Sequence, residues 1–447
     1  MGTSSNDISF LPNKIDNIWE KTQKMFCIEA KSIQDLNNIF NHGNSNLLNK
    51  IEKSFPEDGI QFLKVYNNIR ELILDINNIF PNGELKLLKS NTTNKIILTR
   101  KQVALIFILG FFNIFDLGMS KMNINSRYDF YKILNSYKDP NLSKGRSFIN
   151  YMTIIGKWLE ENNPILNEQI TYLRENKNFN IKNFENIKQL CDIEIIEQGS
   201  MFDTKASFCI DFANKNIGGG VLNKSIVQEE ILFTVEPEAI VSIFLMEKMD
   251  DNDAIRIDNL IQYSNYSGYA KTFKYENSAI NDKKLIKHNI IAIDAVFDYS
   301  GGLDKDSVLR DLIKAYVGFN LINFDDIDVI KLDKTISTGN WGCGAFGGDF
   351  ELKFIQQWLA ATFAGVEKLY YYTFKRNEMD FAKKNVDNIR LIKPYDLYLR
   401  LTKRELKKRK VLEIIMDDSS DNIIKLKQVP VYNSNSGKRK KCCCWQD

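Results

Sequence analysis

The sequence predicts an α/β layered domain over residues 183–420, preceded by an all-helical accessory region over residues 1–182. Two observations lead to this division. Before residue 183, apolar residues recur at spacings of three and four, as on one face of a helix. After it, short apolar runs typical of strands alternate with longer helical patterns, which indicates an α/β fold. The remaining tail, residues 421–447, is expected to be disordered at its end.

Three segments of the first region have a clear helical pattern, at residues 49–80, 103–115 and 146–162. The second of them, "VALIFILGFFNIF", is the most apolar run of the chain. It is interrupted by Asn113, closed by Asp116 and shorter than the ~20 residues that a membrane helix needs. We therefore expect a buried helix. No secretory signal pattern is present at the start, so the protein is not expected to be secreted.

The predicted α/β domain contains the following elements in chain order. Strands are predicted at residues 206–214, 288–297 and 368–374, and a hairpin with arms at residues 254–264 and 269–275. Helices are predicted at residues 237–249, 307–319 and 349–365. The first strand, "ASFCIDFAN", would deliver Asp211 and Asn214 to a loop, and the last helix would end at Gly365.

Composition and charge exclude several classes of function. The formal net charge of +3 is nearly balanced, so the chain lacks the overall basic field of a nucleic-acid coat protein, and direct DNA binding is not expected. Seven cysteines show neither disulfide nor zinc spacing, which favours a reducing compartment. The two histidines, His42 and His288, have no partner at ligand spacing. We therefore expect no metal and no cofactor.

A glycine triplet and a pair of acids form the first candidate site. Three consecutive glycines let backbone amides approach an anion, and a seven-residue spacer separates them from Gln-Glu-Glu. A carboxyl in a partly desolvated cleft beside a second carboxylate has a raised pKa, which suits a general acid for glycoside cleavage. A flexible turn followed by a solvated helix start is the alternative interpretation. The residues are Gly218, Gly219, Gly220, Gln228, Glu229 and Glu230.

A second glycine-rich loop, "TGNWGCGAFGGD" at residues 338–349, contains the pattern G-x-G-x-x-G from Gly342 to Gly347. It predicts a loop that holds a diphosphate and opens a helix at Asp349. A nicotinamide dehydrogenase would place this pattern after the first strand, with an acid about 20 residues further on. Glu367 has near that spacing, but the loop comes late in the domain and no histidine stands in a motif. The dehydrogenase hypothesis is therefore disfavoured.

Five motifs in order carry a resemblance: "DFANKNIGGG", "VQEEILF", "YSGYA", "TGNWGCGAFGGD" and "YYYTF". Together they resemble the eukaryote-type poly(ADP-ribose) glycohydrolases over about Asn183 to Arg400, and more weakly through "LTRKQVALIFILGFF". The resemblance implies a macrodomain-like three-layer α/β/α fold with a mixed sheet behind the helical region. It also implies cofactor-free hydrolysis of ribose–ribose O-glycosidic bonds of poly(ADP-ribose), mainly from the free end, with release of ADP-ribose in the DNA damage response.

The resemblance assigns roles to the acids. Glu230 would protonate the leaving ribose oxygen and then activate water, Glu229 would hold ribose hydroxyls, and Asp211 would support them from the preceding strand. Asn214 and the amides of the glycine triplet would contact the terminal ribose, and Gln228 would lie near the adenine side of the site.

The resemblance also assigns the remainder of the substrate site. Phe374 would stack on adenine, Tyr269 would close over the ligand, and Phe346 would shape the distal ribose site. The family has an acid that reads the adenine amino group, and both Glu197 and Asp203 fit that place. The loop that cradles the diphosphate would consist of Asn340, Gly342, Cys343, Gly344, Ala345 and Phe346.

Partners and location follow from the same resemblance. The expected partners are poly(ADP-ribose) and poly(ADP-ribosyl)ated proteins, the product is ADP-ribose, and the protein is expected to be a monomer in the nucleus or cytoplasm. A non-catalytic ADP-ribose-binding macrodomain is the alternative, although such a module has no need for two carboxylates at the ribose. The tail, Lys438 to Lys441 followed by three cysteines, fits a nuclear-import patch, a palmitoylated membrane segment, or a solvated tail with neither role.

Overall fold

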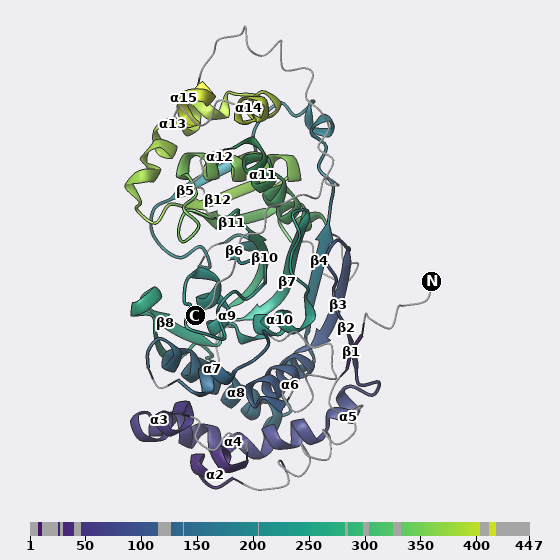
Figure 1. Cartoon of the computed structure of the whole chain (residues 1–447), viewed down its shortest axis with the longest axis vertical. Helices are drawn as coiled ribbons and strands as arrows, with labels where there is room; N and C mark the ends of the chain where they lie inside the picture. The colour runs from purple at the N-terminus through teal and green to yellow at the C-terminus, as the bar shows by residue number, and fades with distance from the viewer. Residues whose placement is uncertain are drawn as a thin grey trace.

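The computed structural model describes most of the chain (Figure 1). The described residues are 8–10, 26, 30–39, 46–114, 127–136, 138–203, 205–281, 285–297, 304–324, 332–402 and 411–416. The tail from residue 417 and His42 lie outside them, so the expectations for both stay predictions.

A mixed eight-stranded sheet crosses the molecule. Five neighbouring strands are parallel, and the three at the other side, β3, β4 and β7, are antiparallel to their neighbours. In spatial order the strands are β3 (Asn94–Thr99), β4 (Gln169–Asn176), β7 (Asp253–Ile261), β10 (Lys287–Asp294), β6 (Phe208–Ala213), β11 (Thr335–Gly339), β12 (Lys368–Tyr372) and β5 (Asp192–Ile196).

Each face of the sheet is buried against its own hydrophobic core. In β10, Ile290 and Ala292 belong to one core, whereas Ile291 and Ile293 belong to the other. Successive side chains of a strand point to opposite faces, so a strand covered on both sides is apolar throughout. This explains why "NIIAI" shows no alternation of polar and apolar residues.

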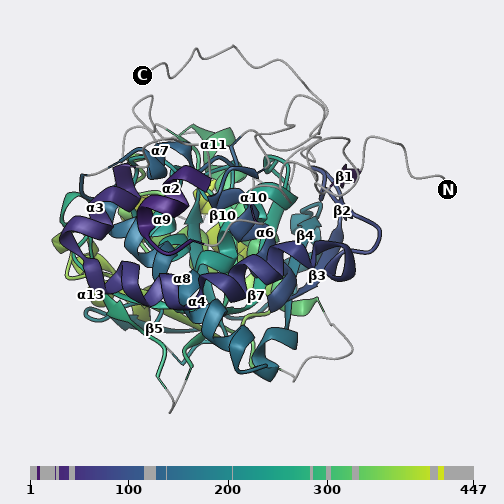
Figure 2. The same cartoon turned by 90° about the horizontal axis from the view of Figure 1, so that it is seen from below.

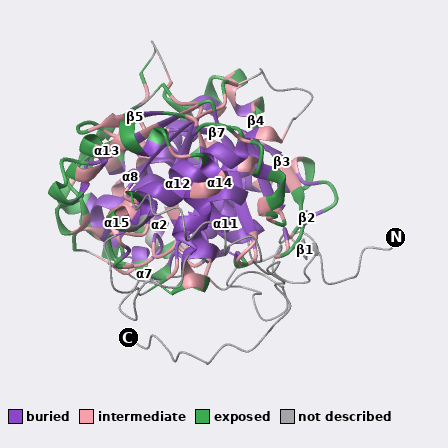
Figure 3. Cartoon of the chain, turned by 90° about the horizontal axis from the view of Figure 1, so that it is seen from above, coloured by how far each residue is buried: buried purple, intermediate pink, exposed green. Residues whose placement is uncertain are grey.

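Helices cover both faces (Figures 1 and 2). One face packs against α4 (Pro56–Leu74), α6 (Arg100–Phe111), α8 (Asn141–Glu160), α9 (Gln228–Val235), η5 (Pro237–Ile240) and α10 (Val241–Leu245). The other face packs against α11 (Lys305–Asn320) and α12 (Phe350–Ala364), which are almost wholly buried (Figure 3). The structure thus has three layers, which confirms the predicted fold class.

Shorter elements complete the fold. A second small sheet is a hairpin of β8 (Ser264–Ser267) and β9 (Lys274–Ser278). The other elements are β1 (Ile8–Phe10), α2 (Ile33–Ile39), α3 (Asn46–Ser54), α5 (Ile76–Ile79), β2 (Glu84–Lys86), α7 (Tyr131–Leu134), η3 (Pro164–Asn167), η4 (Ile181–Phe184), η6 (Ala270–Thr272), η8 (Leu321–Asn323), η9 (Asn377–Met379), α13 (Asp380–Arg390), α14 (Pro394–Leu401) and α15 (Val411–Met416).

Most predicted elements are confirmed, including the buried helix α6 and both ends of α12. The side chain of Asp349 accepts a hydrogen bond from the Leu352 N–H (2.8 Å) at the start of α12. Gly365, with φ +74°, ends the helix in the left-handed conformation. In the part of the chain that the structure describes, no helix is both long and apolar enough to span a bilayer.

Two predictions of local structure are wrong. The first region is not all-helical, because β3 and β4 extend the sheet. The pattern of β4 is masked by Arg174, which is fully buried and ion-paired with Asp253 (2.7 Å). The predicted hairpin is also displaced, because its first arm contains β7, which pairs with β4 and β10. The division of the chain at residue 183 stays a prediction.

Candidate active site

Three loops that carry the predicted site residues follow neighbouring parallel strands. Strands β6, β11 and β12 lie side by side and end at Ala213, Gly339 and Tyr372. The carboxyl ends of parallel strands meet at one edge of a sheet, where ligands of α/β proteins usually bind. The fold therefore brings together the glycine triplet, the second glycine loop and the loop of Phe374.

Glu229 and Glu230 lie in the first turn of α9 and are both almost completely buried. The Glu229 carboxylate accepts hydrogen bonds from the N–H groups of Asn214 (2.9 Å) and Gly218 (2.6 Å). The Glu230 carboxylate accepts from the N–H groups of Gly220 and Val227, both at 2.8 Å. Four backbone donors thus fix the orientation of the two neighbouring carboxylates, which a helix alone would let diverge.

Gly219 stands between these two carboxylates. A Cβ atom on Gly219 would lie 2.5 Å from Glu229 Oε2 and 2.6 Å from Glu230 Oε1, and φ is +47°. The Gly219 N–H donates to the Asn216 carbonyl (3.0 Å). All three glycine N–H groups are therefore used within the chain. The amides of Gly218 and Gly220 thus orient the carboxylate pair, and the expected contact of the triplet with a ribose stays a prediction.

Asp211 adds a third buried acid behind the pair. It lies on β6 with no exposed surface, and among the described residues neither of its carboxyl oxygens has a hydrogen-bond partner. Burial, followed by repulsion from Glu230 and Glu236, raises the pKa of Asp211 well above its usual range. Burial and repulsion from Asp211 and Glu230 likewise raise the pKa of Glu229. The cluster therefore keeps protons at a pH where exposed carboxyls are ionised.

Gln228 and Asn214 connect the acids to the sheet. The Gln228 side chain accepts from the Phe212 N–H (2.8 Å) and donates to the Ile210 carbonyl (3.2 Å), so it continues the hydrogen bonding of β6. The Asn214 side chain accepts from the Asn216 N–H (3.0 Å). Gln228 thus anchors the start of α9 on the strand that carries Asp211, and its predicted place beside adenine stays a prediction.

The second glycine loop uses its backbone amides differently from the glycine triplet. Its ends are closed by hydrogen bonds from the Gly348 N–H to the Gly342 carbonyl (2.9 Å) and from the Gly347 N–H to the Gly344 carbonyl (3.1 Å). In the described part of the chain, the N–H groups of Gly344, Ala345 and Phe346 have no acceptor. A Cβ on Gly344 would meet no atom within 4 Å. Free amides over open space suit an anionic ligand.

Asn340 and Cys343 have structural contacts inside this loop. The Asn340 side chain donates to the Thr373 carbonyl (3.2 Å) and accepts from the Tyr371 hydroxyl (3.4 Å), which joins the loop after β11 to β12 and to the loop that follows it. Burial raises the pKa of the Cys343 thiol to about 12, so it stays protonated.

The predicted aromatic residues surround these loops. Phe374 is 46% exposed and lies close to Gly339, because a Cβ atom on Gly339 would come within 3.1 Å of the Phe374 ring. Phe346 packs edge to face against Phe297, with ring centroids 5.3 Å apart. Tyr269, on the turn of the β8–β9 hairpin, is 56% exposed. Partial burial and repulsion from Glu230 raise the pKa of Tyr269.

The two candidates for the adenine-reading acid lie in different surroundings. Glu197 directly follows β5 and forms an ion pair with Lys383 of α13. The charge of the Asp203 carboxylate raises the pKa values of Tyr266, on the hairpin, and of His288, on β10. The adenine contact stays unassigned between them.

Lys144 is a further candidate that the sequence motifs do not include. It is a fully buried lysine of α8 whose side-chain nitrogen donates to carbonyl oxygens of the loop after the glycine triplet. Arg376 is another candidate outside the sequence motifs. Its positive charge lowers the pKa values of both Tyr269 and Cys343. Lys144 is far from its partners in the sequence, and only its place in an otherwise buried helix could have singled it out.

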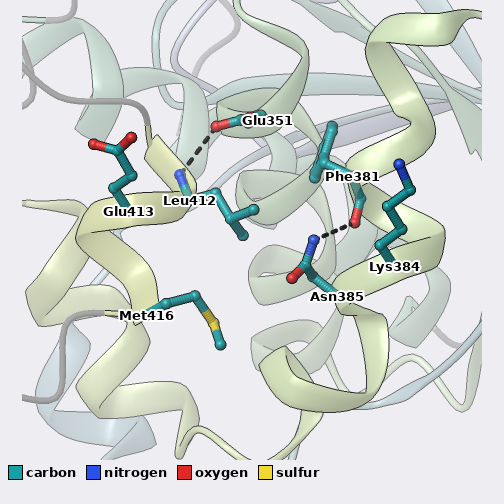
Figure 4. Close-up of a pocket in the computed structure, with 7 residues that line it drawn as sticks. All are labelled: Glu351, Phe381, Lys384, Asn385, Leu412, Glu413 and Met416. Carbon is teal, nitrogen blue, oxygen red and sulfur yellow. Dashed lines mark hydrogen bonds between the residues drawn. The ribbon is translucent and has the colours of Figure 1, made fainter.

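A separate pocket lies at the opposite end of the domain from α9 and β8, between α12, α13 and α15 (Figures 1 and 4). None of the predicted site residues lines it. The lining residues are Glu351, Phe381, Lys384, Asn385, Leu412, Glu413 and Met416, and the Glu351 carboxylate accepts from the Leu412 N–H (3.0 Å).

Comparisons with known proteins bear on both regions of the chain. Residues 181–381 match the family model described as poly(ADP-ribose) glycohydrolase (PARG), macro domain fold, and residues 56–174 match the model for the helical domain of the same family. The chain is 28% identical over 340 residues to the probable poly(ADP-ribose) glycohydrolase 2 of Arabidopsis thaliana, which covers 65% of each chain. It is 34% identical over 213 residues to the poly(ADP-ribose) glycohydrolase 1 of Caenorhabditis elegans, covering 43% of this chain and 26% of that relative.

The match therefore spans less than two thirds of these relatives. Among solved structures, the poly(ADP-ribose) glycohydrolase of Deinococcus radiodurans in complex with ADP-ribose is similar, with a TM-score of 0.29 and 13% identity over 46% of this chain and 88% of that one.

Proposed function

We propose, since this chain belongs to the poly(ADP-ribose) glycohydrolase family, that it hydrolyses the ribose–ribose O-glycosidic bonds of poly(ADP-ribose) and releases ADP-ribose mainly from the free end. The observation that carries this proposal is the pair Glu229 and Glu230, held side by side by four backbone N–H groups beside a loop with free amides. A pair of oriented acids is what glycoside cleavage requires.

In the proposed reaction, Glu230 donates a proton to the leaving ribose oxygen as the bond to the anomeric carbon breaks. The same carboxylate then takes a proton from the water that attacks this carbon, which restores the acid. Glu229 hydrogen-bonds ribose hydroxyls, and the negative charge that develops on Glu230 as it gives up its proton stabilises the oxocarbenium-like transition state. The raised pKa values of Glu229 and Asp211 support an acidic site, because burial makes these carboxyls hold their protons to a higher pH than exposed carboxyls do.

Substrate binding in this proposal uses both glycine loops and the aromatic residues. The free N–H groups of Gly344, Ala345 and Phe346 bind the diphosphate. Phe374 stacks on adenine, which contributes about 1–3 kcal/mol by analogy with nucleobase binding. Tyr269, at the turn of a hairpin beside Glu230, closes over the ribose.

The test is the variant Glu230→Gln, which keeps the shape of the side chain and removes the acid. We expect turnover of purified polymer to fall by at least about 100-fold, as for loss of a general acid, while ADP-ribose binding is largely kept. Glu351→Gln is the control, because Glu351 lies in the separate pocket and its turnover should stay close to wild type. Near-normal turnover of Glu230→Gln would refute the proposal.

The alternative is a module that binds ADP-ribose without catalysis. It is disfavoured because such a module has no use for two buried carboxylates and the four amides that orient them. Incubation of polymer with catalytic amounts of the protein, followed by chromatography of the products, separates the two. Free ADP-ribose supports hydrolysis from the end, oligomers indicate internal cleavage, and intact polymer supports the binding module.

A further inference from the structure

Lys144 of α8 is a buried lysine that the proposed reaction does not use directly. Its side chain has no exposed surface, and among the described residues no carboxylate forms an ion pair with it. Its side-chain nitrogen instead points at backbone carbonyl oxygens of the last glycine of the triplet and of the loop that follows it. The acceptors are those of Val221 (3.0 Å), Asn223 (2.7 Å), Gly220 (3.4 Å) and Ser225.

These carbonyls converge because the loop is a series of tight turns. The Val221 N–H donates to the Gly218 carbonyl and the Asn223 N–H to the Gly220 carbonyl, both at 2.9 Å. Gly220 is wedged inside the turn, since a Cβ on it would lie 2.5 Å from the Cβ of Ser225. An ammonium group surrounded by carbonyl oxygens holds such a loop in one conformation, because buried carbonyls need hydrogen-bond partners.

The two halves of this loop orient different carboxylates. The N–H groups that orient Glu229 come from Asn214 and Gly218, before or at the start of the triplet. The N–H that orients Glu230 from this loop comes from Gly220, whose own carbonyl faces Lys144. Lys144 therefore touches the half of the loop that serves the proposed proton donor. Burial lowers the pKa of Lys144 to about 7, and attraction to the Glu230 carboxylate opposes this shift.

We propose that Lys144 is a positioning residue for the reaction: it holds residues 220–225 so that the Gly220 N–H stays directed at Glu230. The inference rests on the proposed function, and it gives the helical region a part in catalysis. Nearby contacts of the same helix agree with this, because the Asn150 side chain donates to the Tyr263 carbonyl (2.8 Å) at the base of the hairpin that carries Tyr269.

The experiment compares Lys144→Met and Lys144→Ala with a matched control, Lys314→Met. Lys314 of α11 is equally buried and also donates to backbone carbonyls, those of Asp250 and Asp253, but it does not contact the glycine loop. It also pairs with the Asp294 carboxylate (2.8 Å), so its loss should destabilise the fold at least as much.

Turnover of polymer, its KM, the ADP-ribose Kd and thermal unfolding are measured for each variant. We expect both Lys144 variants to lose about 10- to 100-fold in kcat, as a misplaced acid would, with KM and Kd little changed. The Lys314→Met control should lose stability but keep kcat.

Chemical rescue separates positioning from general destabilisation. Lys144→Ala lacks three carbons and the ammonium group, which propylammonium replaces. Propylammonium should restore about 10-fold in kcat, whereas tetramethylammonium at equal ionic strength should not, because it has no N–H donor. If Lys144→Ala folds only with propylammonium, the additive is then dialysed away while kcat and the near-UV circular dichroism signal are followed. The proposal is supported if kcat is lost before the circular dichroism signal.

Several results would overturn it. Wild-type kcat in Lys144→Met, an equal kcat loss in Lys314→Met, equal rescue by both cations, or loss of kcat only together with the folded signal would each do so. An inactive wild-type protein refutes the proposed function itself. An active wild type with an equally active Lys144→Met variant refutes the role of Lys144 alone.

Discussion

The substitution Gly219→Ala tests whether the glycine triplet exists to hold the two carboxylates. Two effects oppose a side chain at this position. The left-handed conformation, with φ +47°, costs about 1–2 kcal/mol for a residue with a Cβ. The new Cβ would also lie 2.5 Å from Glu229 Oε2 and 2.6 Å from Glu230 Oε1, well below an ordinary contact of 3.4 Å.

The magnitude follows from the hydrogen bonds that these two oxygens accept. Each oxygen would have to move by roughly 0.8–0.9 Å to reach ordinary contact. The same oxygens accept from the Asn214 N–H (2.9 Å) and the Gly220 N–H (2.8 Å), so both bonds would be lengthened or lost. Such a hydrogen bond contributes about 0.5–1.5 kcal/mol where the acceptor is a protonated carboxyl and about 1.5–3 kcal/mol where it is a carboxylate. We expect the free energy of unfolding to fall by about 4 kcal/mol and kcat to fall by about 100-fold, because the proton donor is displaced by almost 1 Å.

The assay combines urea unfolding with the initial rate of ADP-ribose release from polymer. Gly365→Ala is the matched control, because Gly365 also has a positive φ of +74° but a Cβ there would meet no atom within 4 Å. It should lose only about 1–2 kcal/mol from the left-handed conformation and keep its turnover. The reasoning is refuted if Gly219→Ala turns over polymer at the wild-type rate, or if it is no less stable than Gly365→Ala.

Three further predictions concern the acid cluster, the buried core and adenine. The raised pKa of Asp211 means that the folded protein gives up this proton at a higher pH than the unfolded chain, so the carboxyl's contribution to stability is lost as pH rises through the folded pKa. Asp211→Asn should therefore gain stability relative to wild type as pH rises above about 4, and parallel pH profiles in urea unfolding would contradict this. Glu238→Gln should lower the free energy of unfolding by about 3–5 kcal/mol. The reason is that the Glu238 carboxylate pairs with the buried Arg100 and accepts from the Tyr263 hydroxyl (2.6 Å). A loss below about 1 kcal/mol in the same assay would show that the pair is dispensable. Phe374→Ala should raise the ADP-ribose Kd about 5- to 150-fold, because stacking on adenine contributes about 1–3 kcal/mol. The melting temperature should change little, because the ring is 46% exposed. An unchanged Kd in calorimetry would exclude the stack.

Much of the local structure could be read from the sequence, because the signals involve neighbours within one turn. The apolar run at residues 103–115 predicts the buried helix α6, and Gly365 predicts the end of α12. The sequence also identifies both glycine loops and the pair Glu229 and Glu230 as candidates. The strand β4 was missed because charged residues interrupt its apolar pattern. Arg174 is tolerated there because it pairs with Asp253 on the neighbouring strand and donates to backbone carbonyls that are distant in the sequence.

The use of each glycine loop was decided by the tertiary structure. From the sequence, the amides of both loops could serve an external anion. In the fold, those of Gly218 and Gly220 serve the chain's own carboxylates, whereas in the described part of the chain those of Gly344, Ala345 and Phe346 remain free. The difference arises because α9 starts against β6, so its first-turn acids reach the loop that follows the same strand.

Local sequence indicates which residue types could perform the chemistry and which turns carry them. The tertiary structure decided which of them meet. Strand order brings β6 beside β11 across more than a hundred residues, and α8 brings Lys144 to the carbonyls of residues 220–225. Such contacts depend on the pairing of strands buried on both faces and on the burial of a polar side chain in a distant helix. Neither leaves a periodic pattern in the sequence, because periodicity reports only the local direction of side chains.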